Sequence, residues 1–160
     1  MKDYLGLNSN ESFEYDIALI DIDSSEVFNN FQMKEADKNY FITSFDLFSL
    51  KKGLEILSGI NFEIYMKKIL FSKTMSQAED DYLNFISRDY HIVWDEDKIY
   101  FPFELGDQSV IIEGQRVAKI KFKYLSGQYK DSLLFIVEEI LGNISAGELR
   151  RVMRNIEKGA

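Results

Sequence analysis

Two aspartates at the end of an apolar run are the residues of this chain whose types and spacing best suit an enzyme. The run is Ala18-Leu19-Ile20, and Asp21 and Asp23 follow it with one residue between them. At the end of a strand, residues two apart point to the same side, so both carboxylates would face one metal ion. A carboxylate pair beside a divalent cation can act on a phosphate group. The spacing therefore raises the hypothesis of a metal-dependent phosphatase or nuclease.

This Asp-x-Asp segment resembles the motif of haloacid-dehalogenase-type phosphatases, with Ser25 where that family usually has threonine. The resemblance would imply a nucleophilic carboxylate at Asp21, a magnesium ion, a parallel sheet, a lysine and a second acidic pair. Asp80 and Asp81 are the only adjacent aspartates, and they fall in the first turn of an expected helix, where carboxylates favour the helix dipole. We therefore expect no divalent metal at Asp21 and Asp23, and no cofactor.

Other catalytic groups are few. The chain has no cysteine, which excludes disulfides, thiolate nucleophiles and cysteine-based metal sites. Its one histidine, His91, has aromatic neighbours and is expected to be a packed or surface residue rather than a metal ligand. Glu96-Asp97-Lys98 has the letters of a nuclease Glu-x-Lys motif, but we expect it in a turn and not within a strand. These residues favour a protein that is not an enzyme.

The charges are divided unevenly along the chain. Residues 1–114 carry 22 acidic and 10 basic side chains, a balance of −12, whereas residues 115–160 carry 5 acidic and 9 basic, a balance of +4. The whole chain has a net charge of −8 and an isoelectric point near 4.7. This asymmetry indicates a charged partner, or an electrostatic contact between the two halves.

The predicted partner surface is an acidic turn framed by aromatic residues. It consists of Trp94, Asp95, Glu96, Asp97 and Tyr100. Large rings supply buried contact area at a protein interface, and carboxylates steer a basic partner toward it. We therefore expect a basic protein, such as a toxin or a nuclease, to bind here.

The basic residues of the last third form two groups, one on an expected strand and one on the last expected helix. They are Arg116, Lys119, Lys121, Lys123, Arg150, Arg151 and Arg154. The lysines alternate with Ile120 and Phe122, which predicts that the lysines are exposed and the apolar residues buried. The last two helices also have the outline of a helix-turn-helix, but that class needs a basic domain. Nucleic acid is therefore not the expected partner, and a function for this basic set is left open.

Hydrophobic periodicity predicts an α+β fold in which helices pack on an antiparallel sheet built from hairpins. Strands are expected at 13–22, 62–71, 90–94, 99–103, 110–112 and 117–124, with hairpin turns at 95–98 and 113–115. Helices are expected from Ser44 to Gly59, from Ser76 to near Arg88, from Asp131 to Gly142 and from Ser145 onward. Two helices therefore close the chain, and the structure of 24–38 is left open.

The chain is expected to form one domain spanning 1–160. It has a single proline, Pro102, and no linker-like stretch of glycine, serine and proline. The longest uninterrupted apolar run, Leu133 to Val137, is far shorter than the ~20 residues that cross a membrane. No apolar signal segment follows Met1. These features predict a cytoplasmic protein without a membrane contact.

The sequence therefore favours a binding protein in the role of an inhibitor or immunity-type protein that masks a basic toxin or nuclease. Surface carboxylates could take the positions of substrate phosphates and speed association by long-range attraction. One alternative is a structural or adaptor protein, with a phage origin as an option, that forms homo-oligomers through hairpin edges. Another is the metal-dependent enzyme that uses Asp21 and Asp23. A third is a nucleic-acid regulator acting through residues 116–158.

Overall fold

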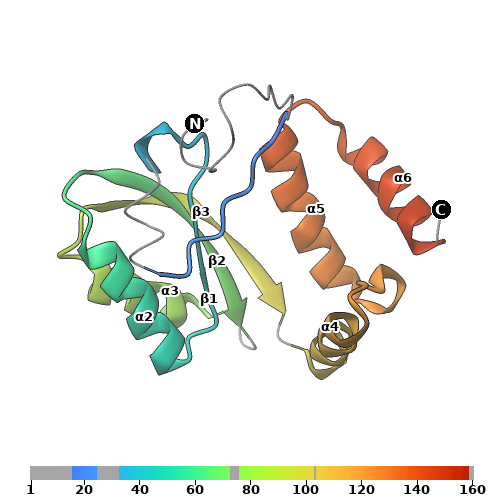
Figure 1. The fold of residues 1–160 in the computed structure, drawn as a ribbon, viewed down its shortest axis with the longest axis horizontal. Helices are drawn as coiled ribbons and strands as arrows, with labels where there is room; N and C mark the ends of the chain where they lie inside the picture. Colours follow the sequence, from blue (N-terminus) through green and yellow to red (C-terminus); the bar gives the residue numbers. More distant parts are fainter. Residues whose placement is uncertain (1–15, 25–32, 73–75, 103, 159–160) are drawn as a thin grey trace, which may run out of the picture.

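The computed structural model describes residues 16–24, 33–72, 76–102 and 104–158, and its centre is a three-stranded parallel sheet (Figure 1). The strands are β1 (Tyr40–Thr43), β2 (Ile64–Ser72) and β3 (Ile92–Pro102), in the order β1-β2-β3. Helix α2 (Leu47–Ser58) connects β1 to β2, and α3 (Gln77–Ser87) connects β2 to β3. Parallel neighbours need such crossovers, because the chain must return to the same edge of the sheet before each new strand.

The remaining elements follow the sheet, except for the 3₁₀ helix η2 (Met33–Glu35), which precedes β1. They are α4 (Leu105–Val117), the 3₁₀ helix η3 (Phe122–Tyr124), α5 (Gly127–Leu141) and α6 (Ala146–Glu157). Figure 1 shows three layers, with α2 and α3 on one side of the sheet, α5 on the other, and α6 outside α5. The fold is therefore a mixed α/β arrangement.

Strand β2 is buried on both of its faces. Ile64, Met66 and Leu70 join a core cluster with residues of α2 and α3. Ile69 belongs to a second, smaller cluster on the other face, against which Phe71 and residues of α5 pack. A strand covered on both sides is typically a nearly continuous apolar run, and this segment departs from that pattern at Lys67 and Lys68, one on each face.

The antiparallel hairpin sheet predicted from the sequence is wrong, because both strand pairs are parallel. Of the two segments expected as a first hairpin, residues 92–94 and 99–102 belong to the single strand β3, which continues through the acidic residues between them, and residue 103 lies outside the described residues. Residues that often form turns are also tolerated at a bulge, where a strand gains residues without reversing direction. Pro102 lies at the last position of the strand, where a missing N–H costs least.

The second predicted hairpin is also wrong. Residues 110–112 lie inside α4, and residues 117–124 contain the end of α4, a short loop and η3. Helix α4 ends where Ala118 takes a left-handed conformation with a φ of 50° and the Lys119 N–H donates to the Gly114 carbonyl at 2.9 Å. The three lysines of this segment are exposed as predicted, but Ile120 is also 58% exposed. The β propensity of residues 110–112 and 117–124 therefore did not decide their structure, because these residues form α4, the loop after it and η3.

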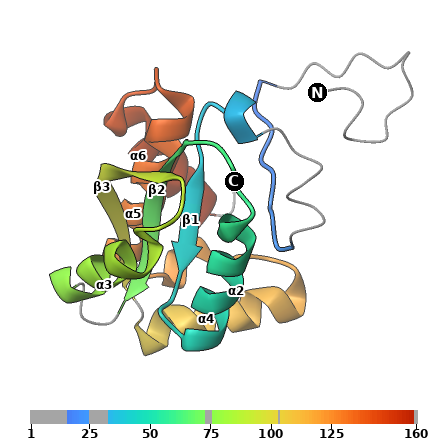
Figure 2. The same ribbon diagram turned by 90° about the vertical axis from the view of Figure 1, so that its left-hand side faces the viewer.

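The strand predicted at 13–22 is not observed. Residues 13–15 lie outside the described residues, and residues 16–24 form an exposed, extended segment without strand pairing (Figure 2). The sequence left the structure of residues 24–38 open, and within that range residues 33–35 form η2.

Helices were predicted more accurately. Helix α2 is capped by Asp46, whose carboxylate accepts the Ser49 N–H at 2.9 Å, and it ends at Gly59 as expected. Helix α6 begins with the predicted capping box of Ser145 and Glu148. At α3 only the serine half of the box forms, because Glu79 accepts the hydroxyl of Ser72 instead.

The predicted end of α5 at Gly142 is confirmed, but its start is not. The capping residue is Ser126, which lies two residues after the end of η3 and five residues before the predicted cap Asp131. The Ser126 hydroxyl accepts the Tyr129 N–H at 3.1 Å, and the Asp107 carboxylate accepts both the Ser126 N–H and its hydroxyl. Within the described part of the chain, no helix combines the length and apolar character needed to cross a bilayer.

Candidate contact surface at the β3 bulge

The predicted acidic turn is a bulge in the middle of β3. Met66 of β2 is the register partner of Trp94, and Lys68 is the partner of Lys98. Three residues of β3, 95–97, therefore lie opposite the single residue Lys67. Such a bulge redirects side chains and interrupts regular pairing. It places three consecutive acidic residues on a strand instead of at the tip of a hairpin.

Asp95 is tied to the sheet by an ion pair with Lys67, at 3.3 Å. Its carboxylate also accepts the Asp97 N–H at 3.0 Å, and this bond, more than the neighbouring Lys67, holds the pKa of Asp95 below its usual range. Glu96 and Asp97 are exposed and have no ion-pair partner among the described residues. The uncompensated negative charge of the bulge is therefore that of Glu96 and Asp97.

Lys67 also joins the bulge to α5. Its ammonium lies 2.6 Å from the Glu139 carboxylate, which in turn accepts the Tyr40 hydroxyl at 3.1 Å. Burial would raise the pKa of Glu139, but the hydrogen bond and charge of Lys67 outweigh it and lower that pKa. Burial and the charge of Glu139 together raise the pKa of Tyr40, which stays a neutral donor. The position of Asp95 is thus supported by a buried network and does not depend on a loop.

The two predicted aromatic residues point away from this surface. Trp94 is half-buried, its Nε1 donates to the Ser87 hydroxyl at 2.9 Å, and its ring lies 5.8 Å from that of Phe41. Tyr100 is also half-buried against the cluster of α2 and α3, and its hydroxyl donates to the Ser76 carbonyl at 3.4 Å. Both rings therefore pack on the face opposite Asp95.

Two other aromatic residues border the bulge in their place. Tyr65 is 71% exposed and pairs in register with Val93, two residues before Asp95 on the same face of the sheet. Phe135 of α5 is 47% exposed, and its ring centroid lies 5.8 Å from the Lys67 ammonium. We call Tyr65, Asp95, Glu96, Asp97 and Phe135 the acidic bulge surface. Sequence gave no signal for Tyr65 and Phe135, because each lies in an apolar run where burial is the default expectation.

A second charged cluster lies on the opposite face of the sheet. Lys68 and Lys98 both contact Asp80 of α3, at 2.6 and 2.5 Å, and Lys68 also donates to the Asn84 side chain at 2.6 Å. Burial would raise the pKa of Asp80, but hydrogen bonds from both lysines outweigh it and lower that pKa. This cluster is closed, because every member is bonded within the fold. It supports the sheet and offers no group to a ligand.

The residues considered for catalysis are not brought together. Asp21 and Asp23 are exposed on the extended segment 16–24, and His91 is exposed at the start of β3. Across the described ranges, no group of three or more histidine, aspartate or glutamate side chains could hold a metal ion. The sheet is parallel, as the phosphatase resemblance would require. However, Asp21 and Asp23 do not lie at the end of a strand of that sheet.

The basic set of the last third is exposed as a whole. It comprises Arg116, Lys119, Lys121, Lys123, Arg150, Arg151 and Arg154. Because η3 packs against α6, the two groups lie on the same side of the molecule. Lys130 links this region, since its ammonium lies 2.7 Å from the Glu157 carboxylate and donates to the Lys123 carbonyl at 3.4 Å.

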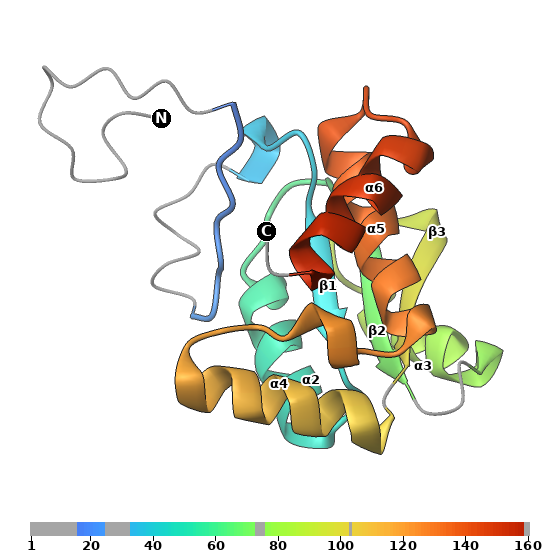
Figure 3. The ribbon, with the colours of Figure 1, turned by 90° about the vertical axis from the view of Figure 1, so that its right-hand side faces the viewer.

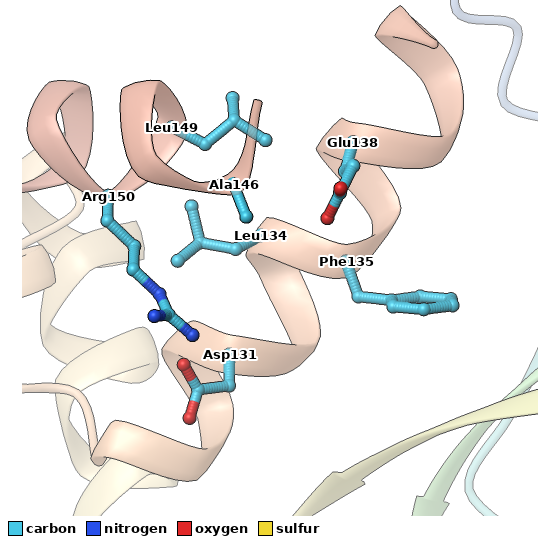
Figure 4. Close-up of a pocket in the computed structure, with 7 residues that line it drawn as sticks. All are labelled: Asp131, Leu134, Phe135, Glu138, Ala146, Leu149 and Arg150. Carbon is cyan, nitrogen blue, oxygen red and sulfur yellow. The ribbon is translucent and has the colours of Figure 1, made fainter. Parts of the chain in front are cut away.

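A hollow between α5 and α6 has a volume of about 120 Å³ (Figure 4). Leu134 and Leu149 form part of its apolar lining, and Asp131, Glu138 and Arg150 are its charged lining residues (Figure 4). Sites for small molecules usually enclose about 300–1,000 Å³. This hollow is therefore small for a substrate.

No protein-family model, curated protein or solved structure matches this chain. The geometry of the acidic bulge surface is therefore the basis for a functional proposal.

Proposed function

We propose that this protein is a binding module whose acidic bulge surface engages a basic protein, in the manner of an inhibitor or immunity protein. The observation that carries the proposal is the bulge itself. It presents Glu96 and Asp97 to solvent from a strand whose neighbour Asp95 is held by Lys67. Charges held on a rigid element can attract a partner without the entropy loss of ordering a loop.

In this proposal the aromatic contacts with the partner come from Tyr65 and Phe135, and not from Trp94 and Tyr100 as the sequence suggested. A side chain that is already packed inside the fold gains little new burial when a partner binds, whereas an exposed ring gains much. Tyr65 is 71% exposed and Phe135 is 47% exposed. We therefore assign the steering of the partner to Glu96 and Asp97, and the buried contact area to the two rings.

Photocrosslinking in the cells that express the protein tests whether a partner contacts this surface. A photoreactive amino acid at position 96 should give an adduct with a protein of basic isoelectric point. The same amino acid at position 55, an exposed glutamate on α2, is the control and should not give that adduct. Equal labelling from both positions, or adducts with acidic proteins only, would contradict the proposal.

Binding of a fluorescent polylysine peptide measures the electrostatic part in isolation. The double variant Glu96→Gln/Asp97→Asn should bind about fivefold more weakly than wild type, because two exposed charges contribute roughly 1 kcal/mol together. The matched control Glu55→Gln/Glu104→Gln removes the same charge from exposed positions elsewhere and should bind more tightly than the bulge variant. The bulge variant should also show a flatter dependence on salt. Identical affinities for the two double variants would contradict the assignment of partner steering to Glu96 and Asp97.

A further inference from the structure

The outer edge of β1 is open and, apart from its short length of four residues, lacks the features that normally prevent strand pairing. Lys67 N–H donates to the Asn39 carbonyl at 2.9 Å, so the alternation of a parallel ladder turns the N–H and C=O groups of Tyr40 and Ile42 away from β2. The strand consists of Tyr40-Phe41-Ile42-Thr43, with no charge, proline or bulge. The side chain of Ile42 is 62% exposed. An edge of this kind is competent to accept another strand.

The opposite edge of the sheet shows the contrast. Strand β3 carries the bulge, four consecutive charged residues at 95–98, and Pro102. Proteins use these three features to block pairing at exposed edges. The sheet is therefore protected on the β3 side and unprotected on the β1 side.

The segment 16–24 lies outside this open edge. Figures 2 and 3, which view the molecule from opposite sides, show it on the outer side of β1 with the same general direction, and Figure 1 shows that it crosses the line of β1 obliquely. It exposes three large apolar residues, since Ile17 is 42%, Leu19 81% and Ile20 46% exposed. Ile22 at its far end already packs against the core cluster of α2 and α3. The segment is thus anchored near the edge while most of its apolar surface remains in water.

We infer that residues 16–24 add to β1 as a fourth parallel strand. Ile20 has the same parity as Ile22 and would face the α2 and α3 side, whereas Ile17 and Leu19 would lie on the other face beside Ile42. Pairing satisfies the outward backbone groups of β1 and buries apolar surface on both chains. The connection is long enough, because the 15 residues from 25 to 39 exceed the dozen that a parallel crossover requires.

In the structure this segment is unpaired, and the inferred pairing is a second state of the same element. The pairing is independent of the proposed partner surface, which lies on the bulge of β3 at the other edge. The occupant is the chain's own segment. The same edge could instead receive segment 16–24 of a second copy, and the experiment separates these cases.

Stability of two lysine variants tests whether the segment is buried in solution. If the pairing forms, Leu19→Lys and Ile20→Lys should each raise the unfolding equilibrium constant roughly 10- to 100-fold, because each puts a charge at a buried apolar position. The matched control is Leu47→Lys at the start of α2, where the leucine is 77% exposed and the change should be near neutral. Three equal and small effects would overturn the pairing.

Hydrogen exchange of the Ile42 amide gives a readout that does not depend on the folding of a destabilised variant. In the wild-type protein the pairing should slow exchange at Ile42 by roughly 100-fold relative to an unprotected amide. Ile20→Pro, which removes a ladder donor, should restore fast exchange at Ile42. Fast exchange at Ile42 in the wild type would overturn the inference. Protection that rises with protein concentration would assign the edge to a second copy and would also overturn the intrachain pairing.

Discussion

Asp80→Asn should be among the most destabilising single changes in this protein. Asp80 is 5% exposed and is the shared acceptor of Lys68 and Lys98 on one face of the sheet. Asparagine keeps the shape of the side chain but removes its charge. Two lysines would then keep their positive charges in a partly buried site without the carboxylate that balances them.

The magnitude follows from the distances. Two unit charges 2.6 Å apart, as Lys68 and Asp80 are, attract by roughly 6 kcal/mol at an effective dielectric constant of about 20. Most of this is offset by the desolvation of the two ions, and breaking such a buried pair typically costs about 3–5 kcal/mol. The side chain of Lys98 is 21% exposed and can turn toward water, so the lower end, about 3 kcal/mol, is expected. That is a large fraction of the roughly 5–15 kcal/mol that stabilises a domain.

Urea denaturation followed by far-ultraviolet circular dichroism measures the effect. The matched control is Asp81→Asn, one residue further along α3, where the carboxylate is exposed and accepts only the Gln77 side chain at 2.9 Å. The control should change the free energy of unfolding by less than about 0.5 kcal/mol. The melting temperature of Asp80→Asn should fall by roughly 6–12 °C.

A loss below about 1 kcal/mol for Asp80→Asn would refute the reasoning, because the lysines would then not depend on Asp80. The double variant Lys68→Met/Asp80→Leu provides a second check. It removes the charged pair as a unit, so it should recover much of the stability lost in Asp80→Asn. A double variant that is less stable than Asp80→Asn would mean that packing, and not charge, dominates at this position.

Two further predictions concern α5 and the end of α4. Lys67, Tyr40 and Lys38 lower the pKa of Glu139 despite its burial. The ionised carboxylate therefore contributes its full stabilisation well above the ordinary pKa of glutamate, and this stabilisation is lost as the pH falls through the lowered pKa of the folded state. The difference in unfolding free energy between wild type and Glu139→Gln should therefore shrink between about pH 6 and pH 3, and a difference that grows toward acid would contradict this. Ala118→Gly should stabilise the protein by about 0.5–1 kcal/mol in urea titrations, since Ala118 has a φ of 50° that only glycine adopts without strain; a loss of stability would contradict it.

Several helix ends were predictable because their signals are local, although the start of α5 and the whole of α4 were missed. A hydroxyl or carboxylate that accepts a free N–H of the first turn acts within a few residues, as at Asp46 and Ser145. A glycine that ends a helix, such as Gly142 with its φ of 67°, is local as well. These features do not depend on how the strands are arranged, so an incorrect sheet left them unaffected.

The direction of the strands was not predictable from the same kind of pattern. A stretch such as 95–98 has the composition of a turn, and only its partner Lys67 on β2 makes it a bulge. The aromatic residues Trp94 and Tyr100 were expected on two strands of a hairpin and at the partner surface. Both lie on the single strand β3 and pack against the cluster of α2 and α3, because burial depends on which helices cover each face. Tyr65 could not be identified for the converse reason, since it is 71% exposed although Ile69, on the same face of β2, is buried.

Lys67 and Lys68 are adjacent on β2, point to opposite faces, and meet a carboxylate of a different helix, Glu139 of α5 or Asp80 of α3. The ion pairs on the two faces therefore have no residue in common. A substitution at Lys67 requires an answering change in α5 or in Asp95, and a substitution at Lys68 requires one in α3, so the two sets of positions can diverge without constraining each other. The layer formed by α5 can therefore be remodelled over generations while the α3 layer keeps its charges.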